Sequence, residues 1–299
     1  MKKIISLMSL LLSTVSFAHD DANSGKNIFR EVVVTENISM LQGTGGNVGL
    51  LKGEDGLLII DDDYKVNVGA LEKILDKEDG KPRFIINTHW HNDHTGGNEH
   101  LGEYVTIIAH DNVRKRLSTA QEIKFFGMKI QASEKPALPV VTFDTSISLH
   151  FNGQELKVVH YPNGHTDGDS IVVIQPANVV HMGDHFFSGR FPFVDVESGG
   201  DVIGMIKNIK SVIETLDPKV KVIPGHGPLS ALSDLKEYSH MLETTSAIVK
   251  EAIDEGMSLK QAQAKGFPGR WKSWGAGFID EKKWIKMVYT SLKAGEHSS

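Results

Sequence analysis

The chain has 299 residues, enough for one large domain or two small ones, and its 40% hydrophobic and 23% charged residues are ordinary for a soluble globular protein. The formal net charge of −6 argues against nucleic acid as a partner. The absence of cysteine excludes disulfides, a cysteine nucleophile and thiolate metal ligands. Any bound metal ion must therefore use imidazole and carboxylate groups.

The N-terminus has the pattern of a secretory signal peptide. Lys2 and Lys3 precede an apolar run from Ile4 to about Val15, and Ser16-Phe17-Ala18 provides small residues of the A-x-A kind. The run is shorter than the ~20 residues that a membrane span needs. We therefore expect cleavage after Ala18, no stable membrane anchor, and a mature domain of residues 19–299 that is periplasmic or secreted.

Strand and helix patterns alternate along the mature chain. In the first half we expect two strands within 47–61 that turn at 54–56, a helix over 66–77, strands over 83–88 and 105–110, and a helix with Asp111 as its N-cap. In the second half we expect a strand pair within 140–160, two strands within 170–184, a helix over 202–216 and a strand and loop over 219–227. A helix over 232–255 and shorter helices in the tail complete the chain. Each half contains strands, a helix and a strand that ends in a histidine loop. This pattern predicts one domain of two mixed β-sheets packed face to face with helices outside, an αββα sandwich of the α/β class.

The stretch NTHWHNDHTGGN at residues 87–98 follows an apolar strand and concentrates potential metal ligands. His89 and His91 are two residues apart, so their side chains can converge on one point, and Asp93 and His94 can serve a second point nearby. Neutral imidazole and carboxylate suit divalent zinc. Imidazoles this crowded are costly to hold together without a partner that binds them, which favours a metal site over a polar turn.

Three further loops supply ligand residues in the same context. NGHTDGD contains His165, HMGDHFF contains Asp184, and IPGHG contains His226. Each loop follows an apolar strand-like run and has glycine beside the ligand. Because loops at strand ends meet at one rim of a layered α/β fold, we expect these residues to converge with the first motif.

In this order, THWHNDH, GHTDGD, the Gly-Asp pair at 183–184 and PGHG resemble the motifs of the metallo-β-lactamase superfamily, over a region from about Val33 to about Leu242. The resemblance implies the αββα sandwich with two zinc ions per chain in a cleft between the sheet edges. It assigns the ligands as follows: His89, His91 and His165 to the first ion, Asp93, His94 and His226 to the second, and Asp184 to both as a bridge. Asp61 resembles a buried aspartate that orients a ligand imidazole, although a turn or helix-cap role is equally open.

The resemblance implies a metal-dependent hydrolase in which a hydroxide held between the zinc ions attacks a carbonyl. Water bound to zinc has its pKa lowered towards roughly 7, so such a hydroxide is available at neutral pH. Asp93 is the expected catalytic residue, which orients the nucleophile and accepts its proton. No protein nucleophile is required, in agreement with the absence of cysteine and of a G-x-S-x-G element.

The expected partner is a small-molecule substrate of the β-lactam, lactone or ester class. The combination of His94 with Asp184 resembles lactonases and glyoxalase II thioesterases more than the β-lactamases with a cysteine ligand. A β-lactamase proper, which confers β-lactam resistance, and an acyl-homoserine lactonase both stay open. A glyoxalase II-type thioesterase is disfavoured because export separates the enzyme from cytosolic glutathione.

Four residues are candidate substrate contacts. Arg190, in FFSGRFPF, is the cation nearest to Asp184 and could bind a substrate carboxylate. Phe191 belongs to a cluster with Phe186, Phe187 and Phe193 that lines either an apolar pocket or the core. Trp271 and Trp274, in RWKSWGAGF, could form a lid or simply fix the C-terminal helices.

Overall fold

The computed structural model describes residues 28–78 and 80–296. The predicted signal peptide and its cleavage site lie outside these residues. Within the described residues, no helix combines the length and the apolar character that a membrane crossing requires.

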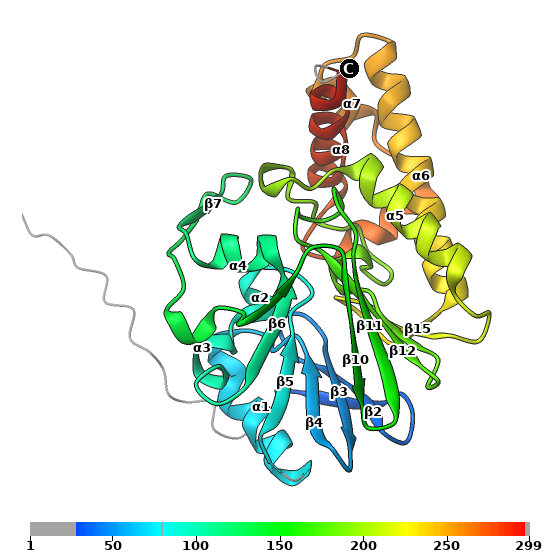
Figure 1. Cartoon of the computed structure of the whole chain (residues 1–299). Helices are drawn as coiled ribbons and strands as arrows, with labels where there is room; N and C mark the ends of the chain where they lie inside the picture. The colour runs from blue at the N-terminus through cyan, green and yellow to red at the C-terminus, as the bar shows by residue number, and fades with distance from the viewer. Residues whose placement is uncertain (1–27, 79, 297–299) are drawn as a thin grey trace, which may run out of the picture.

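Two mixed β-sheets pack face to face with helices on their outer sides (Figure 1). The first sheet contains, in spatial order, β1 (Arg30–Val33), β2 (Ile38–Gln42), β3 (Val48–Gly53), β4 (Gly56–Ile60), β5 (Pro82–Ile86), β6 (Thr106–His110) and β9 (Val141–Phe143). The second contains β10 (Ser146–Phe151), β11 (Gln154–His160), β12 (Ser170–Gln175), β13 (Val179–His181), β14 (Lys221–Ile223) and β15 (Ser230–Ala231). The predicted αββα sandwich is confirmed.

The apolar faces of the two sheets form one shared core. Met40, Leu58 and Ile86 of the first sheet are buried with Val158 and Val172 of the second. The parallel strands β4, β5 and β6 are nearly continuous apolar runs because both of their faces are covered. In β10, by contrast, exposed residues alternate with more buried ones, which is the pattern of a strand with one face in water.

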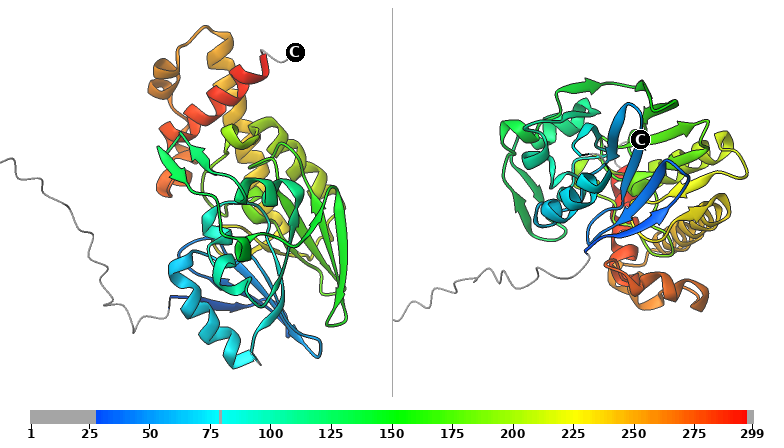
Figure 2. Two further views of the ribbon diagram at one scale, coloured as in Figure 1. Left: turned by 60° about the vertical axis from the view of Figure 1, so that its left-hand side comes forward. Right: turned by 90° about the horizontal axis from the view of Figure 1, so that it is seen from below.

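Helices cover both outer faces (Figure 2). The first half carries α1 (Val68–Leu75), α2 (Asn92–Thr95), α3 (Asn98–Leu101) and α4 (Asp111–Leu117), and 3-10 turns η1 (Lys65–Asn67), η2 (Asp76–Glu78) and η3 (Lys135–Ala137). The second half carries α5 (Val202–Thr215), α6 (Leu232–Asp254), α7 (Leu259–Lys265) and α8 (Glu281–Glu296), with η4 (Gly183–His185), η5 (Val196–Ser198) and η6 (Gly269–Ala276). The helices α6, α7 and α8 extend beyond the sheets as a C-terminal helical part.

The structure corrects two local predictions. The N-cap of α4 is His110 and not Asp111, because His110 retains an extended backbone and its Nδ1 accepts a hydrogen bond from the Asn112 amide at 3.2 Å. The sequence analysis also missed a hairpin of β7 (Gln121–Ile123) and β8 (Met128–Ile130). Each of these strands has only three residues, which is too short to show the apolar alternation by which longer strands are found.

Candidate metal centre

The structure brings all seven predicted ligands together at one edge of the sandwich. They occupy the loops that follow β5, β11, β13 and β14, and the short helix α2. Two groups result: His89, His91, His165 and Asp184 form the first group, and Asp93, His94 and His226 form the second. Within each group, the potential ligand atoms lie within 4.8 Å of one another.

In the first group, three imidazole nitrogens converge. His91 Nδ1 lies 3.2 Å from His89 Nε2 and 2.8 Å from His165 Nε2. The Oδ2 atom of Asp184 is 3.4 Å from His165 Nε2 and 3.8 Å from His89 Nε2. All four residues are buried, and these short distances leave no room for water between their polar atoms.

The outer nitrogens of these imidazoles determine where their protons lie. His91 Nε2 is 3.1 Å from Asp195 Oδ2, and His165 Nδ1 is 2.8 Å from the Phe193 carbonyl oxygen. Both oxygens can only accept a hydrogen bond, so the proton of each neutral ring lies on the outer nitrogen. Their inner nitrogens therefore present lone pairs to one another.

The position of the His89 proton is set in the same way, by the hydroxyl group of Thr88. The Thr88 hydroxyl donates to Asp61 Oδ2 at 2.8 Å, so its oxygen accepts from His89 Nδ1 at 3.0 Å. The Nε2 lone pair of His89 then points into the cluster. Three lone pairs and one carboxylate cannot satisfy each other by hydrogen bonding, whereas a divalent cation binds all four. The donor set therefore fits a metal ion.

The second group is arranged around Asp184 and the partly open side of the site. His94 Nδ1 lies 2.8 Å from Asp61 Oδ2, which leaves its Nε2 facing Asp184 Oδ1 at 3.1 Å and His226 Nε2 at 3.3 Å. The Oδ2 atom of Asp93 is 3.3 Å from His226 Nε2. Asp184 Oδ1 is buried and makes no hydrogen bond within the described residues, as expected of a carboxylate oxygen that binds a cation.

The electrostatics of the two groups differ. Burial lowers the pKa of His89 and lowers that of His165 to about 4, so these rings are neutral. In the second group, burial also disfavours the charged rings, but the carboxylates of Asp184 and Asp93 together outweigh it and raise the pKa of His226 to about 9. The pKa of Asp93 is held below its ordinary value because the charge of His94 and a hydrogen bond from His226 overcome the effect of burial.

Asp61 connects the strand-end loops of the two groups. Its Oδ1 accepts from the Thr88 amide at 2.7 Å, and its Oδ2 accepts from the Thr88 hydroxyl and from His94 Nδ1. Its backbone has a φ of 63°, in the left-handed region that is unfavourable for most residues other than glycine. These bonds to Thr88 and to the His94 ring suit the predicted orienting role.

Two glycines permit the close packing of the ligand loops. A Cβ atom on Gly46 would lie 2.2 Å from the ring of His94, and one on Gly225 would lie 2.1 Å from Asp184 Oδ1. Both loops approach ligand residues more closely than any side chain allows. The sequence analysis did not identify these roles because the contacts arise between segments far apart in the chain.

The four predicted substrate contacts lie elsewhere. Phe191 is 1% exposed and packs in parallel with the Trp284 ring at 5.9 Å, and Trp271 is also buried. Trp274 stacks on Tyr238, and Arg190 lies along Gly277. In the described part of the chain, none of the four makes a hydrogen bond, ion pair or ring contact with the seven ligand residues. Their role in substrate binding stays a prediction, and the placement of Phe191 favours a role in the core.

Three residues that touch the ligand rings were not predicted to do so: Asp195 was missed, and Phe187 and Phe193 were assigned only to an aromatic cluster of the pocket or the core. Asp195 accepts from His91, Phe187 stacks on His226 with ring centres 5.0 Å apart, and Phe193 lies 5.8 Å from both His91 and His165. The available signal was their position in FFSGRFPFVD, directly after Asp184. Proximity in sequence did not reveal which of these aromatic side chains turn toward the ligands.

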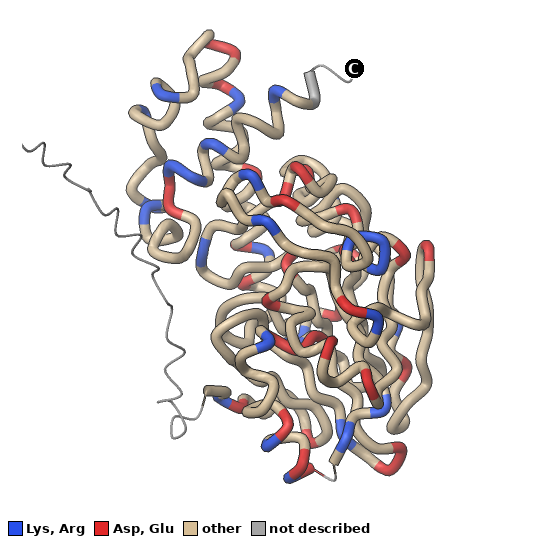
Figure 3. Tube along the Cα trace, turned by 90° about the vertical axis from the view of Figure 1, so that its left-hand side faces the viewer, with Lys and Arg blue, Asp and Glu red and all other residues tan. Residues whose placement is uncertain are grey.

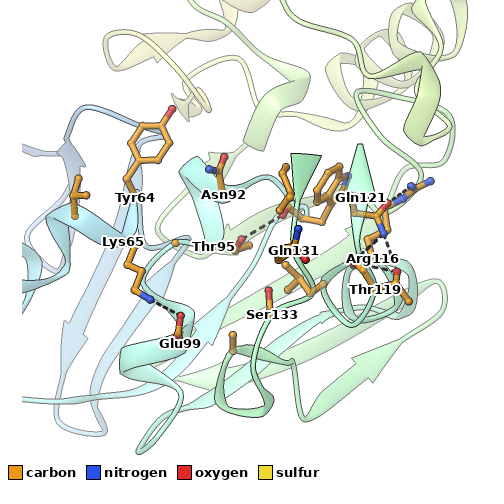
Figure 4. A pocket seen from close by; sticks show the side chains of 16 residues that line it. Tyr64, Lys65, Asn92, Thr95, Glu99, Arg116, Thr119, Gln121, Gln131 and Ser133 are labelled. Atoms are coloured by element: carbon orange, nitrogen blue, oxygen red, sulfur yellow. Dashed lines mark hydrogen bonds and ion pairs between the residues drawn. The ribbon is translucent and has the colours of Figure 1, made fainter. Parts of the chain in front are cut away.

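A cavity of about 350 Å³ lies beside the α2 segment (Figure 4). Asn92 and Tyr64 line it, but none of the seven ligand residues does. Its charged groups are paired, since Lys65 binds Glu99 at 2.7 Å and Arg116 binds Asp167 at 2.8 Å. The cavity is therefore separate from the metal-binding groups.

Comparisons with known proteins agree with this geometry. The family model described as Metallo-beta-lactamase superfamily matches residues 41–226, a range that contains all seven ligand residues. The chain belongs to this superfamily and is a metal-dependent hydrolase. The predicted family and enzyme class are thus confirmed.

Relatives in sequence include a probable metallo-hydrolase of Methanocaldococcus jannaschii, 29% identical over 48% of this chain and 69% of the relative. An uncharacterized protein of Aquifex aeolicus is 32% identical over 52% of this chain and 73% of its own length. Among solved structures, a metallo-beta-lactamase from Pontibacter korlensis has a TM-score of 0.59 at 18% identity and covers 72% of this chain and 99% of its own. An inverting sec-alkylsulfatase from Pseudomonas sp. has a TM-score of 0.65 at 14% identity and covers 88% of this chain and 50% of its own. These structural likenesses concern the fold alone.

Proposed function

We propose that the protein is an exported zinc-dependent hydrolase with two ions per chain and a carbonyl substrate of the β-lactam, lactone or ester class. The observation that carries the proposal is the convergence of three imidazole lone pairs on one point, with Asp184 placed between them and the imidazoles of His94 and His226. Nitrogen and carboxylate donors without thiolate suit zinc among the common divalent ions.

The residues of the first group would hold one ion, those of the second group the other, and Asp184 would contact both. When bound, such ions supply Lewis acidity, which polarises a carbonyl oxygen and lowers the pKa of a coordinated water towards about 7. The outer partners Asp195, Phe193 and Asp61 keep the ligand rings in the tautomers that this binding requires.

Asp93 is the candidate catalytic residue among the ligands. Its side chain is 18% exposed, so it reaches the open side of the site, and its lowered pKa keeps it ionised at neutral pH. An ionised carboxylate at this position accepts a hydrogen bond from the attacking water and fixes its orientation toward the substrate carbonyl.

Two substrate classes have the strongest support. The presence of both His94 and Asp184 in one cluster favours a lactone or ester hydrolase such as an acyl-homoserine lactonase. A β-lactamase proper is the second candidate, and its substrate carboxylate would bind Arg190, which forms no ion pair among the described residues. A thioesterase of the glyoxalase II type is a weaker alternative because export removes the enzyme from glutathione.

The substrate class is tested by a hydrolysis panel on the zinc-loaded mature protein. The panel contains a chromogenic β-lactam, an acyl-homoserine lactone, an aryl ester, a thioester and, because of the alkylsulfatase fold, a secondary alkyl sulfate. A dominant lactone or ester rate that disappears on chelation supports the proposal. Turnover of the alkyl sulfate alone would refute the carbonyl assignment, and a dominant β-lactam rate would select the β-lactamase.

Export is tested separately by fractionation and N-terminal sequencing. The pattern of residues 1–18 predicts that the mature protein begins at His19 and is recovered from the periplasm or the medium. An exported protein that retains Met1, or a pool confined to the cytosol, would contradict this part of the proposal.

A further inference from the structure

Four phenylalanine rings form a continuous row from the metal-binding groups to the protein surface. Phe193 lies at the inner end, Phe126 and Phe125 lie in the middle, and Phe278 lies at the outer end. The ring centres of Phe126 are 4.8 Å from those of both Phe193 and Phe278, and Phe125 is 5.9 Å from Phe193. We call these four residues the aromatic wall.

The inner end of the aromatic wall is part of the ligand environment. The ring of Phe193 is 5.8 Å from those of His91 and His165, and its carbonyl oxygen accepts from His165 Nδ1. The outer end is open, since Phe278 is 67% exposed. A row that begins at the reactive groups and ends in solvent has the form of a binding surface for an extended molecule.

The middle of the aromatic wall is carried by the β7–β8 hairpin, which stands apart from both main sheets near the C-terminal helices (Figures 1 and 2). The hairpin is held in place by a hydrogen bond from the Lys124 amide to Glu197 at 2.7 Å and by Lys286, whose Nζ lies 4.7 Å from the Phe125 ring centre. Three separate segments thus contribute rings to one surface. Because the ring of Phe278 is exposed, hydrophobic burial contributes little to holding it in this row.

Cations flank the outer part of the aromatic wall. Lys283 lies 5.4 Å from the Phe278 ring centre, and Arg190 lies beside Gly277. The trace coloured by charge shows Lys and Arg along the C-terminal helices that adjoin the hairpin (Figure 3).

We propose that the aromatic wall is the subsite for an apolar arm of the substrate, a linear acyl or aryl group attached to the carbonyl that is hydrolysed. The proposal rests on the hydrolase function argued above and adds the chemistry of the group beside the reacting bond. The occupant is the substrate because Phe193 contacts two ligand rings directly, so a molecule bound at the centre extends along the row. Each methylene that the surface removes from water strengthens binding by up to about fourfold.

The experiment compares p-nitrophenyl acetate, butyrate and octanoate as substrates of the zinc-loaded protein. In the wild type we expect kcat/KM to rise with chain length, mainly through a lower KM. The Phe126→Ala and Phe278→Ala variants should lose on the order of tenfold of the octanoate-to-acetate preference. The control is Met128→Ala, on the same hairpin and 41% exposed but outside the aromatic wall, which should keep the wild-type preference. An unchanged preference in both phenylalanine variants would overturn the proposal.

A binding measurement separates this proposal from the proposed function. Decanoate is not hydrolysed, and its affinity for the zinc-loaded proteins can be measured by isothermal titration calorimetry. We expect affinity on the order of tenfold weaker in Phe278→Ala, with the Phe126→Leu variant close to wild type because it keeps an apolar side chain. If decanoate affinity falls in Phe278→Ala but no panel substrate is hydrolysed, the proposed hydrolase function is refuted, whereas the aromatic wall remains a binding subsite.

The alternative occupant is a second copy of the chain, which light scattering after size exclusion detects. A wild-type dimer that dissociates in Phe278→Ala, with an unchanged decanoate affinity, would assign the aromatic wall to an interface and overturn the proposal. A monomer in both proteins, together with the affinity loss, supports it.

Discussion

The two groups of metal-binding residues differ in burial and in charge. The first group, His89, His91, His165 and Asp184, is buried, and burial lowers the pKa values of His89 and His165 so that these two rings are neutral. In the second group, the side chains of Asp93 and His226 are 18% and 19% exposed, and the carboxylates of Asp93 and Asp184 raise the pKa values of His94 and His226. The first group is thus ready to bind a cation, whereas the second must release protons when a cation binds.

This difference suggests a division of labour. A buried site with fixed tautomers binds tightly and exchanges slowly, while a partly open site loses its ion more easily but can contact substrate. We therefore expect the first group to be occupied at lower zinc concentration than the second. Asp184 couples the two groups because each of its oxygens faces one of them.

The largest effect is expected for Asp184→Asn, because this change removes charge from both groups at once. We predict a loss of activity on the order of 10³-fold or more, since stabilisation by metal ions contributes several kcal/mol and each 1.36 kcal/mol corresponds to about tenfold. Zinc analysis should show occupancy reduced at both sites. A variant that keeps full occupancy of one site and normal activity would show that Asp184 does not connect the groups.

The change Asp93→Asn affects the second group alone. Losing the carboxylate weakens this site and misplaces the attacking water, which costs on the order of 10²-fold in kcat. The fold should survive because Asp93 lies at the rim and the core strands are untouched. The measurements are kcat, zinc content and the circular dichroism spectrum. Full zinc content with a near wild-type kcat would mean that another group orients the water.

Much of the site could be predicted from the sequence because each ligand lies in a short motif at the end of an apolar strand. His89, His91, Asp93 and His94 even share one stretch. The same logic of apolar runs predicted the arrangement in two sheets and most helices, but not the N-terminal strands β1 and β2. Local sequence patterns were sufficient to predict the position of a residue wherever that residue directly follows a strand.

The partners that support the ligands could not be predicted in this way. Asp195 binds His91 across 104 residues of sequence, and nothing in its local context distinguishes it from a surface aspartate. The hairpin strands β7 and β8 are too short to carry a periodic signal, so the position of Phe126 beside Phe193 was not foreseen. Phe191 was a candidate for substrate binding, but the C-terminal helix α8 covers it through Trp284.

A matched pair of variants compares the supporting partners of the two groups. Asp195→Asn removes the carboxylate behind His91, and Asp61→Asn removes the one behind His94. Asp195→Asn should weaken zinc binding by about 10- to 100-fold at the first group alone. Asp61→Asn should weaken the second group to a similar degree through His94, and also the first group through Thr88 and His89. Competition with a chromogenic chelator measures both affinities. A loss at the second site in Asp195→Asn, or an unchanged second site in Asp61→Asn, would show that the assignment of the two groups is wrong.

The smallest effect is expected for Arg190→Ala, outside both groups. If Arg190 holds a substrate carboxylate equally in the ground and transition states, its loss raises KM several-fold and leaves kcat little changed. Steady-state kinetics on a substrate with and without a carboxylate supply the test. An equal change in KM for both substrates would exclude this role for Arg190.

The most direct test of the account is a zinc titration of the metal-free protein, followed by calorimetry and by activity in the same samples. Two ions per chain should bind in separate steps, with the weaker step shifted by Asp93→Asn and the tighter step by Asp195→Asn. Binding of a single ion at saturation, or two steps that neither variant separates, would contradict the existence of two distinct metal sites.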